Sequence, residues 1–202
     1  MKPTRTILAI LLALCPAAVC AQSIRMDKPS VADYLPLLDA RGYMAYGFSC
    51  KGLRGKEATF ELREFIEGKE AADSPRMLIP YRLPIKGKKL VIGFIPSDND
   101  STARCIISSE GSFTVGSDLP LRQIYWESRG EHVYRYLSKP FELPRRAGKE
   151  ASFIPLVLYC SFWYDKKHKV VRCCGEKVIK PDLSSEILTH CPHYYVIGMK
   201  IL

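Results

Sequence analysis

The C-terminal third of the sequence contains most of the side chains that could bind a metal. Three of the four histidines and four of the cysteines lie between residues 160 and 193. The run from His190 to His193, taken with Cys173 and Cys174, offers the nitrogen and sulfur ligands that zinc prefers. The spacing of two to four residues that such sites place between paired cysteines is missing, and adjacent residues on a strand point to opposite faces. We therefore predict no metal site, and the sequence contains no motif for an organic cofactor.

The sequence contains no catalytic motif either. A nucleophilic serine needs a histidine and a third orienting group, and the Gly-x-Ser-x-Gly turn that often carries it is absent. Paired carboxylates could hydrolyse a glycosidic bond, and Glu127, Glu131 and Glu142 are candidates, although their spacing is equally that of solvated charges. We predict no catalytic residue and favour binding over catalysis, with a secreted hydrolase that uses a carboxylate site as the alternative.

Aromatic side chains are the candidates for a ligand-binding surface. His132, Tyr134 and Tyr136 alternate along one predicted strand and so share a face. Trp126 and Trp163 lie in other aromatic runs. Exposed rings bind sugars by stacking on their apolar faces, whereas buried rings would only pack a sheet, in which aromatic residues are common anyway. We predict a glycan-binding surface at these five residues, with sheet packing as the competing interpretation.

Residues 1–21 have the plan of a secretory signal peptide, with a basic start, an apolar run from Ile7 to Leu14 and small residues in Val19-Cys20-Ala21. The apolar run is shorter than the ~20 residues of a membrane span, and no other stretch approaches that length. A lipoprotein anchor on Cys20 is disfavoured, because that reaction prefers a smaller residue than valine before the cysteine. We expect residues 22–202 to form one exported domain, periplasmic or extracellular.

Removing this leader changes the composition. The 202 residues carry a net charge of +9, and the leader contributes Lys2 and Arg5 but no acidic residue, which leaves +7 over 181 residues. A hydrophobic content of 47% excludes a disordered chain, and the length fits one domain. Cysteines in an exported chain are expected in disulfides, with Cys160–Cys174 one plausible pair and Cys191 a partner for Cys173. Six candidates remain after the leader: Cys50, Cys105, Cys160, Cys173, Cys174 and Cys191.

Basic residues cluster at three predicted turns, Lys86–Lys89, Arg145–Lys149 and Lys166–Lys169. If these turns lay at one end of the domain, they would attract an anionic partner. An exported protein would meet anionic glycans or envelope polymers rather than nucleic acid. The competing interpretation is that they are solvated turns that favour solubility.

Apolar alternation with a period of two dominates the chain after a short N-terminal helix. Ser30 is placed to begin that helix and Gly42 to end it, and we expect Pro36 to kink or split it. A second short helix is predicted at Ser184–His190. The predicted strands are Met44–Cys50, Thr59–Ile66, Leu90–Phe94, Ala103–Ser108, Phe113–Val115, Tyr125–Trp126, Val133–Leu137, Ile154–Tyr164, Val170–Cys174 and Tyr194–Leu202.

These elements predict a mainly antiparallel β-sandwich with a short N-terminal helix and a short helix before the last strand. Ile154–Tyr164 is apolar on both faces, which is typical of a central strand covered on both sides. The alternation also places Cys50 on the core side of its strand. An α+β fold with a mixed sheet is the alternative.

Both ends of the chain resemble small exported bacterial proteins of a family without an assigned function. The resemblance is carried by Ala32-Asp33-Tyr34-Leu35-Pro36-Leu37-Leu38 and by Pro192-His193-Tyr194-Tyr195-Val196-Ile197-Gly198. It implies export and no particular activity. We therefore expect an exported binding or accessory module for a cell-envelope or glycan ligand, and a basic protein-inhibitor domain is a further alternative. The sequence does not indicate an oligomeric state.

Overall fold

The computed structural model describes residue 26 and residues 28–97, 99–143, 153–173 and 175–202. The predicted signal peptide, the basic turn at 145–149 and Cys174 lie outside these residues. By their contacts the residues divide into a unit that ends at Tyr34 and a unit from Leu35 to Leu202. Among the described residues, no helix is long and apolar enough to cross a membrane.

The helix α2 extends over Val31–Ala40. Ser30 begins it, and both its backbone N–H and its hydroxyl donate to the Asp33 carboxylate, over 2.6 and 2.8 Å. Pro36 lies inside the helix, which continues past it to Ala40, so the proline does not split it. Gly42, with a φ of 79°, adopts the left-handed conformation that commonly ends a helix.

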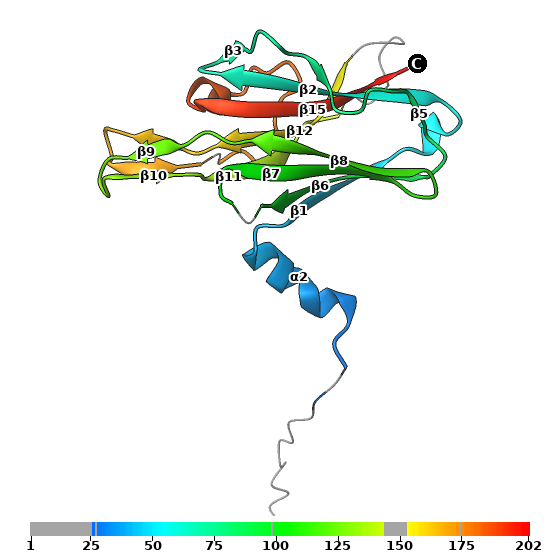
Figure 1. Ribbon diagram of the computed structural model, residues 1–202, viewed down its shortest axis with the longest axis horizontal. Helices are drawn as coiled ribbons and strands as arrows, with labels where there is room; N and C mark the ends of the chain where they lie inside the picture. Colours follow the sequence, from blue (N-terminus) through cyan, green and yellow to red (C-terminus); the bar gives the residue numbers. More distant parts are fainter. Residues whose placement is uncertain (1–25, 27, 98, 144–152, 174) are drawn as a thin grey trace, which may run out of the picture. The chain divides into compact units, whose positions relative to one another are not determined.

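Two antiparallel sheets form the β-sandwich, and Figure 1 shows them as two layers. The first has the strand order β1-β6-β7-β8: β1 Met44–Ser49, β6 Lys89–Pro96, β7 Thr102–Ser109 and β8 Phe113–Pro120. The second has the order β11-β12-β15-β2, and three short strands pair with β2: β11 Tyr136–Pro140, β12 Ile154–Ser161, β15 His193–Ile201, β2 Glu57–Ile66, β3 Lys69–Glu70, β4 Arg76–Met77 and β5 Leu83–Pro84.

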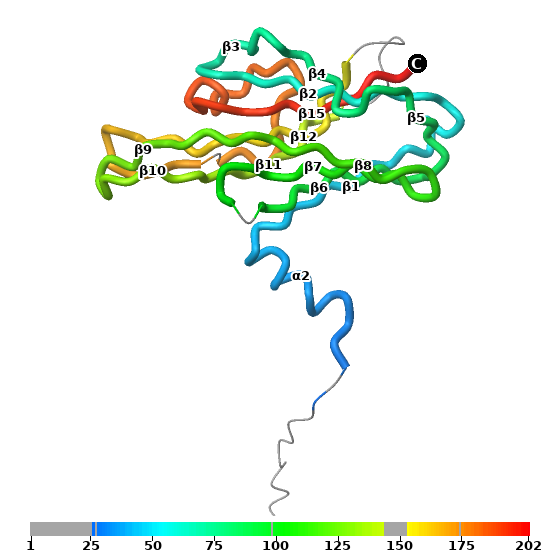
Figure 2. The backbone as a smooth tube through the Cα atoms, viewed as in Figure 1, coloured from blue at the N-terminus to red at the C-terminus, as the bar shows by residue number. Residues whose placement is uncertain are grey.

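Two hairpins and two 3₁₀ turns complete the described fold, and their course can be followed in Figure 2. Every strand pair in the described residues is antiparallel, with one isolated parallel bridge between Phe141 and Ile179, so the mixed-sheet alternative is wrong. The hairpins are β9 Ile124–Trp126 with β10 Glu131–Val133, and β13 Trp163–Asp165 with β14 Val170–Arg172; the 3₁₀ turns are η1 Lys51–Leu53 and η2 Glu186–Thr189.

The main core lies between the two sheets, where the inward-facing residues of both meet. Phe94 of β6 stacks on Tyr159 of β12 with ring centroids 4.4 Å apart, which joins the layers directly. A second apolar cluster lies on the other face of β12 and β15, where Ile179, Ile187 and Leu188 pack against the sheet. The central strand β12 is therefore covered on both sides, as its apolar pattern predicts.

Three predicted elements differ from the structure in more than the positions of their ends. The strand expected at Val133–Leu137 is broken, because Val133 ends β10, which pairs with β9, whereas Tyr136 begins β11, which pairs with β12. The long strand expected after Ile154 divides into β12 and β13, since β13 leaves the sheet to form its own hairpin. The second predicted helix is reduced to the 3₁₀ turn η2.

Five of the six cysteines for which disulfides are predicted lie in the described part of the chain. Cys50, Cys105, Cys173 and Cys191 are free thiols, so the suggested Cys173–Cys191 bridge is not formed. Cys50 follows β1 beside Lys88, whereas Cys105 pairs with Phe94 several residues along the neighbouring strand. That offset exceeds the ~7 Å between Cα atoms that a disulfide can span. Cys160 is buried in the second cluster, and the suggested Cys160–Cys174 pair involves a residue outside the described chain.

Candidate ligand-binding site

At one end of the sandwich the interior is polar. The inward-facing positions of β15 run from Ile201 through Tyr195 to His193, because alternate residues of a strand share a face. On β2 the same alternation extends the inward face from Leu62 to Glu64. Tyr195 pairs with Glu64 across the two strands, which brings these polar side chains to the same end of the core.

His193 and Glu64 lie at the centre of a chain of hydrogen bonds. His193 Nε2 is 3.1 Å from Glu64 Oε1, and Arg76 Nη2 donates to Glu64 Oε2 over 2.8 Å. On the other side of the imidazole, Nδ1 lies 2.5 Å from the hydroxyl of Tyr136. His193 is only 1% exposed, so these partners replace the water that its ring nitrogens would otherwise bind.

The environment of His193 determines which atom holds the proton. Burial lowers the pKa of the imidazole, although the Glu64 carboxylate acts in the opposite direction, so the ring is neutral near pH 7. The carboxylate accepts the proton on Nε2, which leaves Nδ1 as an acceptor for the Tyr136 hydroxyl. Burial also raises the pKa of Tyr136 above its usual value, so the phenol keeps its proton and remains the donor.

The Tyr136 hydroxyl connects this buried network to the segment that precedes β9. The backbone N–H of Arg122 donates to that hydroxyl over 2.9 Å. Ser161, which pairs with Tyr136, accepts from the backbone N–H of His193 over 3.3 Å. The network thus links β4, β2, β15 and β11 to the Arg122 backbone, and it fixes the point from which the Arg122 side chain projects.

A polar pocket of about 380 Å³ opens beside the network. Arg122 forms no ion pair with any described residue, in contrast to Arg76, which pairs with Glu64. The pocket is therefore lined by an arginine that forms no ion pair within the described chain, although the Glu67 carboxylate belongs to the same lining. The polar lining consists of Glu67, Arg122, Gln123, Tyr134, Ser161 and His193.

The β9–β10 hairpin begins at the wall of this pocket with Ile124 and carries an aromatic and cationic surface. The guanidinium carbons of Arg129 and Arg135 lie 4.0 and 5.1 Å from the ring centroid of Trp126. Stacking of this kind orders a guanidinium and leaves its N–H groups directed outward in the ring plane. The Trp126 indole N–H donates to Ser128 over 2.8 Å, which fixes the ring.

The structure separates the five residues predicted to bind a glycan. Tyr134 lines the polar pocket, and Trp126 lies on the adjoining hairpin. His132 is exposed on the same hairpin and packs against Tyr125 with ring centroids 4.9 Å apart. Tyr136 is held inside the buried network and does not share a continuous strand face with His132.

Trp163 lines a different pocket of about 530 Å³, where it stacks on His190, although its strand β13 contacts β9. The carboxylates considered for glycoside hydrolysis, Glu127, Glu131 and Glu142, are all exposed, and Glu131 pairs with Arg129 over 3.6 Å. They form no buried acid pair.

The sequence predictions do not include Glu64 and Arg122, and they consider His193 only as a metal ligand, not as part of this site. The alternation of strand residues could have indicated His193 and Glu64. Ile201, Ile197 and Tyr195 share the inward face of β15, and His193 is the next residue on that face, whereas Glu64 continues the buried face of β2. A polar residue at an inward-facing position needs a partner inside the fold. Arg122 has no comparable signal, because it lies between strands.

Comparison with known proteins identifies one family. Residues 80–202 match the model of a family described as a domain of unknown function (DUF5041). The matched segment contains Arg122, Tyr136 and His193, whereas Glu64 and Arg76 precede it. No curated protein and no solved structure matches the chain.

Proposed function

The chain belongs to the DUF5041 family, and we propose that it is an exported module that binds an anionic glycan of the cell envelope at the polar pocket and the β9–β10 hairpin. The observation that carries this proposal is the Arg122 guanidinium, which lines a polar pocket without an ion-pair partner among the described residues. A guanidinium matches the planar geometry of a carboxylate and binds it with two parallel hydrogen bonds.

The other polar groups of the pocket suit a sugar. Gln123 offers an amide donor and acceptor, and Tyr134 and Ser161 offer hydroxyl groups. A volume of about 380 Å³ is at the lower end of the range for small-molecule sites, and it suits a single acidic sugar ring rather than a long segment of polymer. Glu67, which also lines the pocket, would repel a second negative charge and so favour one orientation of the ring.

The hairpin extends the same surface beyond the pocket. Arg135 forms no ion pair among the described residues, and its guanidinium lies over the Trp126 ring. A sugar residue next to the one in the pocket would meet this cationic and aromatic surface. Binding would therefore use the charge of the polymer at two points, and we expect it to weaken as the salt concentration rises.

Calorimetric titration of the full chain with polygalacturonate, and with the same polymer after its carboxylates are reduced to alcohols, tests the proposal. We expect binding of the first polymer and a loss of roughly tenfold or more in affinity for the second, the size of one charge-assisted hydrogen-bond pair. Equal affinity for the two polymers, or no binding of either, overturns the proposal.

Substitution of Arg122 tests whether polygalacturonate binds at the polar pocket. Arg122→Gln should weaken polygalacturonate binding by roughly tenfold or more. The matched control is Arg104→Gln. Arg104 is an exposed arginine on β7 that does not line the pocket, and its guanidinium pairs with the Asp118 carboxylate at a distance of 3.3 Å. An Arg122→Gln affinity equal to that of the control variant contradicts the placement of the site.

A further inference from the structure

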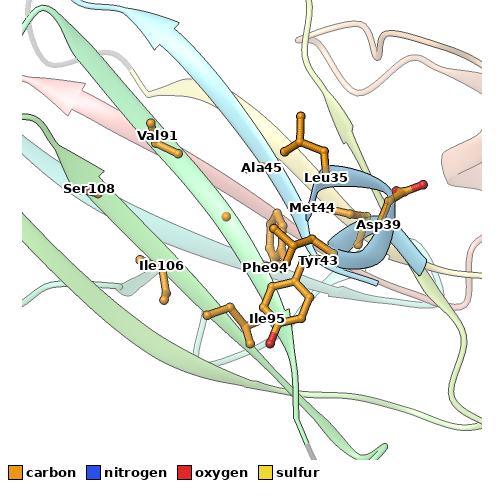
Figure 3. Close-up of a pocket in the computed structure, with 12 residues that line it drawn as sticks. Leu35, Asp39, Tyr43, Met44, Ala45, Val91, Phe94, Ile95, Ile106 and Ser108 are labelled. Atoms are coloured by element: carbon orange, nitrogen blue, oxygen red, sulfur yellow. The ribbon is translucent and has the colours of Figure 1, made fainter. Parts of the chain in front are cut away.

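An apolar groove lies on the outer face of the four-stranded sheet, on the side of that sheet away from the sandwich core. Figure 3 shows the residues around it, with Leu35 and Tyr43 on one side and Val91 and Ile106 on the strands. Its volume is about 480 Å³, and its lining is mostly apolar, with Asp39 and Ser108 as the polar exceptions. Outer faces of antiparallel sheets usually carry polar residues, so an apolar strip here requires an explanation.

Strand alternation explains the shape of the groove. Lys89, Val91, Gly93 and Ile95 occupy alternate positions of β6 and so face the same side of the sheet. Gly93 has no side chain, and a Cβ placed there would have Met44 as its nearest neighbour, through a backbone oxygen 3.4 Å away. The middle of the strip is therefore hollow, and the apolar side chains before and after it form the ends of a trough.

Nothing in the described chain fills this trough. Leu35 and Leu38 of α2 line it, yet they remain 58% and 43% exposed, and α2 has no buried residue. Exposed leucines beside an open apolar groove leave a continuous surface whose contact with water is unfavourable. An apolar ligand in the trough would remove both leucines and the strand residues from water at once.

A positive charge lies at one end of the trough. The Lys89 side chain extends across Gly47, with its Cε only 2.6 Å from the position of a Cβ on that glycine. Gly47 pairs with Val91, so this lysine lies beside the lining residue at that end. Lys89 forms no ion pair with the described residues, and Lys86 and Lys88 in the preceding turn add to the positive charge.

We propose that this groove binds one long-chain fatty acid, with its carboxylate at Lys89 and its hydrocarbon chain along Val91, Gly93 and Ile95 toward Leu35 and Leu38. The length of the strip supports this ligand. The seven residues from Lys89 to Ile95 are separated by six steps along the strand, which span ~20 Å, and a single acyl tail is about half of the ~30 Å hydrocarbon thickness of a bilayer. The ligand is thus matched in polarity at its head and in length along its tail.

Titration calorimetry of the full chain with monomeric palmitate tests the proposal, with decanoate and palmityl alcohol as comparison probes. We expect one palmitate per chain. Each methylene that the shorter acid lacks should weaken binding by up to about fourfold, the change for a fully buried group. The uncharged alcohol and the Lys89→Gln variant should each weaken binding by roughly tenfold, because both remove the charged contact at the head.

Two variants fill the trough and one leaves it unchanged. Gly93→Leu places a side chain in the hollow, and Ala45→Leu does so from an exposed position of β1, so that one variant remains informative if the other fails to fold. Both should reduce palmitate affinity by at least about tenfold. Gly52→Leu is the control, because no atom lies within 4 Å of a Cβ at that glycine and it is outside the groove.

Other results overturn the proposal. These are the absence of palmitate binding, unchanged affinity in folded Gly93→Leu or Ala45→Leu, and binding to anionic vesicles without binding of monomeric palmitate. A second copy of the chain as the occupant would appear as a dimer in sedimentation that Ala45→Leu dissociates. Because the groove and the polar pocket share no residue, failure of glycan binding does not affect this result.

Discussion

Tyr136 and His193 are 57 residues apart in the sequence, and their side chains meet inside the sandwich with the phenol oxygen 2.5 Å from imidazole Nδ1. The contact extends from β11 to β15 across β12, which lies between them in the sheet. It is possible because β12 places the small side chain of Ser161 opposite Tyr136. The bond thus joins two strands that are not neighbours, and it holds the Arg122 backbone at the pocket.

Tyr136→Phe should weaken both the fold and the proposed glycan site. The ring remains, but His193 Nδ1 and the Arg122 backbone N–H lose the hydroxyl that they share. We expect the free energy of unfolding in urea to fall by about 1–3 kcal/mol, the range for a buried polar group left without a partner. Tyr81→Phe is the control, because Tyr81 is 57% exposed, and it should change stability by no more than ~0.5 kcal/mol.

The stability of the protein should fall as the pH decreases below that at which a free histidine titrates. The pKa of His193 is lowered from 6.5 in the folded state, chiefly by burial, and the charges of Glu64, Arg76 and Arg122 act on the same ring. The unfolded chain therefore binds this proton at higher pH than the folded chain does. The contribution of His193 is complete above pH 6.5 and is lost as the pH falls through 6.5 toward the folded pKa.

Urea unfolding at a series of pH values from neutral pH to below 6.5 measures how the free energy of unfolding depends on the protonation of His193. His193→Gln should reduce the slope of stability against pH and lower stability at neutral pH. His132→Gln alters an exposed histidine on the β9–β10 hairpin and should leave the slope unchanged. A variant at His193 with the slope of the parent chain would contradict the assigned cause.

Most of the fold follows from local sequence patterns. Period-two alternation identifies β1, β2, β6, β7 and β15, because one face of each strand is buried against the other sheet. The apolar pattern on both faces of Ile154–Ser161 identifies a central strand for the same reason. The break between β10 and β11 was not predictable, because Tyr134 and Arg135 look like strand residues. Only the pairing of their neighbours with different strands separates β10 from β11.

The candidate site was less accessible to sequence reasoning. His193 and Glu64 are separated by 129 residues, and their contact depends on the register in which β15 pairs with β2. The aromatic pattern singled out Tyr134, which lines the polar pocket, but local alternation does not reveal that Tyr136 turns its hydroxyl into the core. Long-range register decides which polar residues meet, and a one-residue slip would reverse every face.

Cys50 and Cys105 should remain thiols even when the protein is purified without reductant. Both are buried, the offset between Cys50 after β1 and Cys105 on β7 prevents a bridge between them, and burial raises the pKa of Cys105 to about 12. We expect alkylation with iodoacetamide to leave both cysteines unmodified in the folded protein and to label both after unfolding without reduction. Peptide mass spectrometry measures the modification at each site. Either cysteine found in a disulfide-linked peptide would contradict the structure.

The turn before β6 is packed against the β7–β8 turn through Gly87. A Cβ at this glycine would lie 2.3 Å from the backbone oxygen of Glu110, closer than two such atoms approach. Gly87→Ala should therefore move one turn away from the other and lower the free energy of unfolding by about 1–3 kcal/mol, the cost of overpacking. Gly52→Ala is the control, because open space surrounds its Cβ, and its effect should stay below ~1 kcal/mol. Urea unfolding of the two variants separates steric overlap from the general effect of replacing a glycine, and equal stabilities would show that the two turns can separate without cost.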